Sequence, residues 1–268
     1  MPKFLCKACG VQYPDSVAPP EHCIICEDDR QFVPKTGQEW VTPEELAVGR
    51  FNAFRTVAPG LFGLWTTPQF AIGQRAFLVI TPEGNVLWDC ISFLDAATID
   101  IVRALGGLKA IALSHPHFYS AMATWGRTFD CPVLVHEADT NWVVAPDPCI
   151  KFWTSDAMDV LSGVSLHRIG GHFPGSAVLH LADRRSLLTG DTVLVAGDRQ
   201  HVSLMWSYPN YVPLPAEAAK RVGQRLQALD FDALYSAFWG HGDIERGAKA
   251  AIERSVRRHV RGPNAPMD

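Results

Sequence analysis

Two histidines follow directly after a short apolar run. His115 and His117 come after residues 111–113, with Pro116 between them. If the extended backbone continues past the strand end, side chains at i and i+2 point to the same side and can bind one metal ion. Taken alone, a His-Pro-His loop is equally well interpreted as a polar turn. Catalytic zinc sites keep three protein ligands and an open position, so the metal hypothesis requires a third ligand further along the chain.

Metal-type ligands recur beside glycines at three later junctions. They are His172 within residues 170–176, Asp191 after Gly190, and His241 in the segment 239–242. Glycine allows tight turns and a close approach of the backbone to an ion. All three groups are expected at strand or loop junctions.

Apolar patterns and turn residues predict the secondary structure. Strands are expected near residues 70–72, 76–80, 86–88, 111–114, 132–136, 164–169, 177–181, 186–189 and 233–238. Helices are expected over residues 95–105, 120–129, 216–229 and 245–260, and irregular segments over 141–153 and 197–215. Strands first, followed by strand-helix alternation, predict sheets flanked by helices.

Together, the ordered ligand groups closely resemble the metallo-β-lactamase superfamily over nearly all of residues 50–268. The resemblance implies an α/β fold, the four-layer αβ/βα sandwich, with metal at one edge of two packed sheets. Carried over position by position, it implies first-site ligands at His115, His117 and His172. It assigns Asp191 to the bridge between two metals and His241 to the second site.

The sequence departs from the family at two positions. The family pattern His-x-His-x-Asp-His requires aspartate at 119 and histidine at 120, but this chain has Tyr119 and Ser120. We therefore expect one catalytic ion, zinc or ferrous iron, held by the three histidines. Asp191 is the expected catalytic base, and Tyr119 is a second catalytic candidate, although a protonated phenol is a poor ligand. The resemblance also implies that Asp89 holds the histidine loop from outside the ligand set.

Two Cys-x-x-Cys pairs, Cys6 with Cys9 and Cys23 with Cys26, stand near the amino terminus. Four thiolates bind one zinc or iron ion, and so small a segment needs such a staple to fold. The spacing resembles a rubredoxin-like knuckle and equally a zinc ribbon. A closed four-thiolate site has no position for substrate, so we expect a structural or docking role.

We place the knuckle and its linker in residues 1–40 and a metallo-β-lactamase-like domain in residues 41–268. A short helix is expected at the boundary, with Thr42 as its N-cap and Pro43 as its first residue. In the irregular segment 197–215, His201, Trp206 and Tyr208 are candidates for a substrate pocket. Core or lid packing explains the two aromatic residues equally well.

Composition excludes some classes of partner. The net charge is −4 and no basic stripe is visible, so no nucleic-acid partner is expected. No apolar run approaches the ~18 residues of a membrane helix, and the first residues do not resemble a signal peptide. We expect a cytoplasmic protein with a small-molecule substrate, since the cysteine spacing fits a reducing compartment. Self-association and docking through the knuckle are further expectations.

Three functions remain open from the sequence. The first is a metal-dependent hydrolase that acts on an ester, thioester or lactone. The second is an iron oxidoreductase in which the knuckle passes electrons to the histidine site. The third is a non-catalytic metal-binding module, because one fold serves many chemistries.

Overall fold

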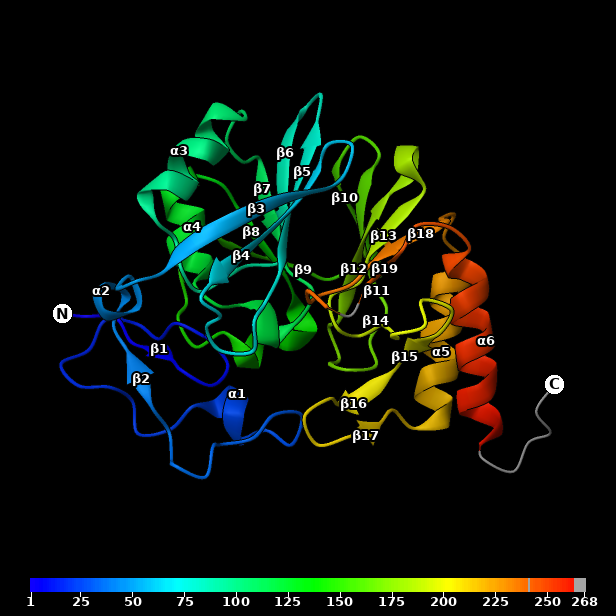
Figure 1. Ribbon diagram of the computed structural model, residues 1–268, viewed down its shortest axis with the longest axis horizontal. Coiled ribbons are helices and arrows are strands. Elements are labelled where there is room, and N and C mark those ends of the chain that lie inside the picture. The colour runs from blue at the N-terminus through cyan, green and yellow to red at the C-terminus, as the bar shows by residue number, and fades with distance from the viewer. Residues whose placement is uncertain (241, 263–268) are drawn as a thin grey trace. The chain divides into compact units, whose positions relative to one another are not determined.

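The computed structural model describes residues 1–240 and 242–262, and the chain forms two compact units that divide between Thr154 and Ser155. In the first unit, a seven-stranded sheet has its strands in chain order (Figure 1). The strands are β3 (Phe51–Ala58), β4 (Leu61–Thr67), β5 (Ala76–Thr81), β6 (Gly84–Trp88), β7 (Ala110–Ala112), β8 (Val133–His136) and β9 (Ile150–Trp153).

Helices connect the parallel strands of this sheet. β3 to β6 pair antiparallel, and β6 to β9 pair parallel. A parallel connection needs a crossover, which α3 (Ala96–Ala104) supplies between β6 and β7, and α4 (Met122–Phe129) between β7 and β8. Val102 of α3 and Trp125 of α4 are buried in one core cluster with residues of these strands. Short 3₁₀ segments, η1 (Pro116–Phe118) and η2 (Glu137–Trp142), follow β7 and β8.

The amino-terminal segment belongs to the first unit, and its two ends pair as short strands. β1 (Leu5–Cys6) pairs antiparallel with β2 (Trp40–Val41), and α1 (Ile24–Glu27) lies between them. The predicted start of α2 (Pro43–Leu46) is confirmed, because Thr42 caps the helix in a reciprocal capping box with Glu45. The domain boundary near residue 40 remains a prediction.

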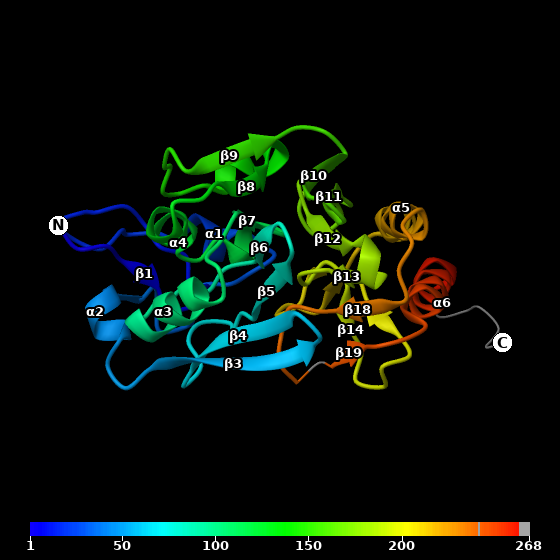
Figure 2. The same cartoon turned by 90° about the horizontal axis from the view of Figure 1, so that it is seen from above.

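The second unit contains a six-stranded sheet with two helices on one face (Figure 2). The sheet order is β10 (Ala157–Leu161), β11 (Val164–Arg168), β12 (Ala177–Leu181), β13 (Ser186–Leu188), β18 (Ala233–Tyr235) and β19 (Asp243–Ile244). Val222 of α5 (Ala216–Gln227) and Ile252 of α6 (Ala248–Arg261) pack into one core with Leu187 and Leu234 of the sheet. The remaining short elements are η3 (Ala182–Arg184), β14 (Leu194–Val195), β15 (Val202–Ser203), β16 (Met205–Ser207) and β17 (Val212–Pro213).

Several predicted elements were wrong or missing. No strand forms at 70–72, because Ala71 and Gly73 adopt positive φ angles of 50° and 76° and make a turn. β3 was missed because its half-exposed residues lack strict alternation, and β4 and β10 were also missed. The segment expected to be irregular before residue 154 ends in β9. No helix within residues 1–240 and 242–262 is long and apolar enough to span a membrane.

Candidate metal centres

The first histidine pair lies at the carboxyl end of β7. The extended backbone continues through His115 but not beyond it, because Pro116 begins η1 and the Phe118 amide donates to the His115 carbonyl over 3.0 Å. The 3₁₀ turn nevertheless brings the rings of His115 and His117 to 5.1 Å between centroids. Nδ1 of His115 is hydrogen-bonded to Oγ of Ser114 at 2.8 Å, which fixes the orientation of the ring.

Asp89 is positioned by the pairing of β6 with β7. Trp88 lies opposite Ala112 in this parallel pair, so the residues that follow the two strands are neighbours. The buried Asp89 accepts a hydrogen bond from the Ser114 amide at 2.8 Å. The structure therefore places Asp89 where it holds the start of the histidine loop, and its effect on metal binding remains a prediction.

Tyr119 and Ser120 lie where the family pattern has second-site ligands. Tyr119 is 2% exposed and belongs to the same core cluster as Trp125 and Leu113. Burial raises the pKa of its phenol well above the ordinary value, so the hydroxyl stays protonated at neutral pH. Ser120 has a positive φ of 40°, and its buried hydroxyl makes no hydrogen bond to the described residues.

The second unit contributes a buried histidine–aspartate pair. Nδ1 of His172 donates to the Met205 carbonyl at 3.1 Å, and Asp191 Oδ1 lies 3.5 Å from Nε2 of His172. Because a carbonyl only accepts, Nδ1 carries the proton of the neutral ring and Nε2 carries its lone pair. A lone-pair nitrogen and a carboxylate oxygen at this distance are two acceptors that suit one cation or a cation and the water bound to it.

Glycine makes the turn before His172 possible. Gly171 has a positive φ of 85°, and a Cβ at this position would meet Val222 Cγ2 at 2.8 Å. A residue with a side chain would therefore strain the backbone and push against α5. Gly171, one of the glycines that marked this group in the sequence, therefore has a steric reason here.

The three pocket candidates lie in different surroundings within the second unit. The Tyr208 ring is 6.2 Å from the His172 ring, and its hydroxyl donates to the Ser203 carbonyl at 3.1 Å. Trp206 packs against the core of this unit. His201 is hydrogen-bonded to Asp198 at 2.7 Å and keeps 40% of its side chain exposed. His241 lies outside the described residues, and the roles of all four remain predictions.

The four amino-terminal cysteines form one buried cluster of free thiols. Sγ of Cys6 lies 3.5 Å from that of Cys26, and Sγ of Cys9 lies 3.6 Å from that of Cys23. These distances are too long for disulfides. Zinc–sulfur bonds of about 2.3 Å put tetrahedral sulfurs about 3.8 Å apart, so the cluster has the dimensions of a tetrathiolate metal site.

Hydrogen-bond donors surround the Cys6 sulfur. The Cys9 amide donates to it at 3.4 Å and Nε2 of Gln38 at 3.0 Å. Hydrogen bonds from the thiols of Cys23, Cys26 and Cys9, and to a smaller extent from the Cys9 amide, lower the pKa of Cys6 and favour its thiolate. The donor set therefore fits a zinc or iron ion, and the predicted knuckle is supported by this geometry.

One buried residue beside these sites gave no sequence signal. Gln74, 4% exposed, donates through Nε2 to the Cys9 carbonyl at 2.7 Å and to the His117 carbonyl at 3.1 Å. It lies between β4 and β5, just after the turn at residues 70–73, and is far from both motifs in sequence. Only the fold brings it between them.

The chain belongs to the metallo-beta-lactamase superfamily, whose sequence profile matches residues 71–241. The predicted fold class and the amino-terminal four-cysteine cluster are both confirmed. Over its whole length the chain is 41% identical to the uncharacterized protein YmaE of Bacillus subtilis, of which it covers 99%.

Solved structures share the fold at low sequence identity. A metallo beta lactamase from Erythrobacter litoralis, solved with beta mercaptoethanol in its active site, matches with a TM-score of 0.57 and 18% identity, covering 78% of this chain and 96% of its own. TTHA1623 in a di-iron-bound form matches with a TM-score of 0.50 and 23% identity, covering 62% of this chain and 87% of its own. These structures support the fold and leave the reaction of this chain to be argued from its residues.

Proposed function

We propose that this protein is a metal-dependent hydrolase in which His115, His117 and His172 bind a single zinc or ferrous ion. The observation that carries the proposal is the buried pair in the second unit, where His172 Nε2 and Asp191 Oδ1 lie 3.5 Å apart. Family membership supports joining this pair with the histidines of the first unit. When bound, the metal supplies a Lewis acid and lowers the pKa of a coordinated water toward neutrality.

Asp191 is the proposed general base. Its carboxylate is 3% exposed and follows β13 in a turn held by Gly190, whose carbonyl accepts from the Ala237 amide at 3.1 Å. A base fixed in this way can orient an attacking water and take its proton. The proposed substrate is a small ester, thioester or lactone, whose carbonyl carbon the water attacks.

A single ion is favoured by the surroundings of position 119. The phenol of Tyr119 is packed in the first unit's core and stays protonated, and Ser120 offers only a neutral hydroxyl. Neither residue supplies the anionic or imidazole ligand that a second metal position requires. The proposal is therefore one ion at the histidine site and one at the cysteines.

Replacing Asp191 by asparagine tests the mechanism. Asp191→Asn keeps the shape but removes the base, so turnover of a screened ester, thioester or lactone should fall by about 10²- to 10⁴-fold. The matched control is Asp230→Asn, because Asp230 is an exposed aspartate whose partner is Arg185. Metal analysis of both variants should find the wild-type content.

An unchanged turnover in Asp191→Asn, with metal still bound, would assign the proton transfer to another group. A second equivalent of metal at the histidine site would contradict the single-ion proposal. The absence of hydrolysis across ester, thioester and lactone panels would contradict the proposed substrate class.

A second candidate function, an iron oxidoreductase, is favoured by one observation. The four cysteines lie in the same unit as His115 and His117, and a buried amide contacts both groups. Metal analysis separates the two candidates. Iron at both sites would favour electron transfer, whereas zinc at both would favour hydrolysis.

A further inference from the structure

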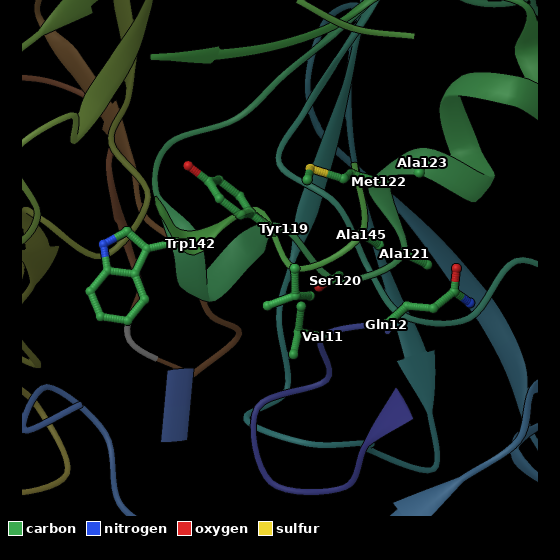
Figure 3. Close-up of a pocket in the computed structure, with 10 residues that line it drawn as sticks. Val11, Gln12, Tyr119, Ser120, Ala121, Met122, Ala123, Trp142 and Ala145 are labelled. Carbon is green, nitrogen blue, oxygen red and sulfur yellow. The ribbon is translucent and has the colours of Figure 1, made fainter. Parts of the chain in front are cut away.

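The four-cysteine segment packs directly on the histidine loop. The Gln12 amide donates to the Ser120 carbonyl at 3.0 Å, three residues after His117. Residues from both segments line a small cavity of about 10 Å³ (Figure 3). This volume admits about one water molecule and no substrate, so the surfaces are closely fitted.

Side-chain hydrogen bonds also connect the four-cysteine segment to the elements before and after the histidine loop. Oε1 of Gln12 accepts from Oγ1 of Thr124, in α4, at 2.6 Å. Oγ of Ser92, which follows β6, donates to the Gly10 carbonyl at 2.7 Å. A Cβ on Gly10 would meet that Oγ at 2.5 Å, so glycine is needed for this close approach.

Gln74 connects the two metal centres most directly. A primary amide nitrogen has two hydrogens, and this one donates to the carbonyl of a cysteine ligand and to the carbonyl of a histidine ligand. Removing this buried donor takes one hydrogen bond from each of the two carbonyls. The position of the Cys9 carbonyl is therefore energetically linked to the position of the His117 backbone.

We propose that the four-cysteine metal site positions the histidine loop, with Gln74 as the positioning residue between them. Metal at the cysteines fixes the Cys6–Cys9 turn and so the position of the Cys9 carbonyl. This carbonyl orients the Gln74 amide, which in turn holds the His117 backbone. This inference rests on the proposed function for the histidine site. Because linkage is reciprocal, metal at either site should strengthen binding at the other.

The test compares two glutamine variants of the full-length protein. Gln74→Met removes the amide at nearly constant size, and the control Gln69→Met makes the same change at an exposed residue of the same turn region. Both are loaded with Co²⁺, whose thiolate charge-transfer bands report the cysteine site. Co²⁺ has d–d bands at both sites, so the d–d bands gained after the charge-transfer bands have saturated report the histidine site. Competition with a chelator then gives the affinity of each site.

In Gln74→Met, the thiolate bands should be unchanged and the histidine-site affinity should fall by about 5- to 150-fold, the usual range of coupling between sites. Gln69→Met should match the wild type. A merely structural role would lower the thermal midpoint without this selective change. Equal histidine-site affinity in wild type and Gln74→Met would overturn the proposal.

A second measurement does not depend on metal at the histidine site. Hydrogen exchange of residues 114–124 is compared in wild type with the cysteine site loaded with Zn²⁺ and after chelation. Exchange should rise on chelation, and Gln74→Met should already exchange faster when loaded. Unchanged exchange in both comparisons would refute the positioning role. A histidine site that never binds Co²⁺ would refute the proposed function instead.

Discussion

At the scale of single residues, Tyr119 lies beside the histidine loop and also packs in the hydrophobic core. It directly follows η1, two residues after His117, yet its ring is part of the core beside Trp125. Burial of the ring stabilises the unit, and the same burial keeps the phenol neutral. The catalytic role assigned to Tyr119 from the sequence therefore requires a protonated hydroxyl.

Two substitutions separate packing from chemistry at this residue. Tyr119→Phe removes only the hydroxyl, so we expect turnover within a few-fold of wild type and nearly unchanged stability. Tyr119→Ala opens a cavity and should lower the free energy of unfolding by about 3–5 kcal/mol. Steady-state kinetics and denaturant titration measure the two effects. If Tyr119→Phe loses activity by about 10²-fold at unchanged stability, the phenol takes part in catalysis.

At the scale of elements, the amino-terminal segment depends on its cysteines. Its buried apolar residues beside the sulfurs are few, chiefly Val11 and Ile25. So small a cluster cannot offset the chain entropy of folding without a metal or another staple. The β1–β2 pair adds only two residues from each strand.

Cys9→Ser combined with Cys26→Ser should release one metal equivalent per chain and increase hydrogen exchange in residues 1–30. The sheet of the first unit should persist, because its core cluster contains no residue of this segment. Cys149→Ser, at a half-buried cysteine outside the cluster, is the control and should keep the metal. Unchanged metal content in the double variant would show that the tetrathiolate assignment is wrong.

Local signals predicted most elements that carry the candidate site. Asp95 caps α3 through the Thr98 amide, and Thr42 caps α2, both at positions marked by polar residues before an apolar pattern. The β3–β4 hairpin was missed because its half-exposed strands are stabilised by pairing across a sheet rather than by a local pattern. A short window of sequence does not show which distant strand it will pair with.

In the candidate site, too, residues with a local sequence pattern were predicted and residues placed by distant contacts were not. The ligand candidates follow strand ends and stand beside glycine or proline, which made them recognisable. Gln74 has no such context, since its partners Cys9 and His117 are 65 and 43 residues away. The bend of the histidine loop also escaped prediction, because Pro116 both permits an extended approach and starts a 3₁₀ turn.

At the scale of the whole molecule, buried thiols make stability depend on pH. Desolvation, with the nearby Asp130 carboxylate, raises the pKa of Cys131 to about 11. An unfolded thiol has a pKa of about 8.5. Above that value the unfolded chain releases the proton that the folded chain still binds, so stability is lost as pH rises toward 11.

Cys131→Ala should therefore flatten the fall of stability between about pH 8.5 and 11. Under reducing conditions, the thermal midpoint of the wild type should fall more steeply with pH than that of the variant between about pH 8.5 and 11. Comparing the two proteins cancels the common effect of pH on metal binding. Parallel curves over this window would mean that the Cys131 thiol does not contribute to the loss.

The pairing of β1 with β2 has a consequence for shortening the chain. Because Leu5–Cys6 lie beside Trp40–Val41, the intervening residues form a loop whose two ends meet. A chain that began at Thr42 would keep all seven strands of the first sheet. It would also remove the Gln12 amide that donates to the Ser120 carbonyl and the Cys9 carbonyl that accepts from Gln74, leaving Gln74 hydrogen-bonded to the His117 carbonyl alone. Deleting this segment would therefore leave the strand order of the sheet intact, but the histidine loop would lose its hydrogen bond from the Gln12 amide.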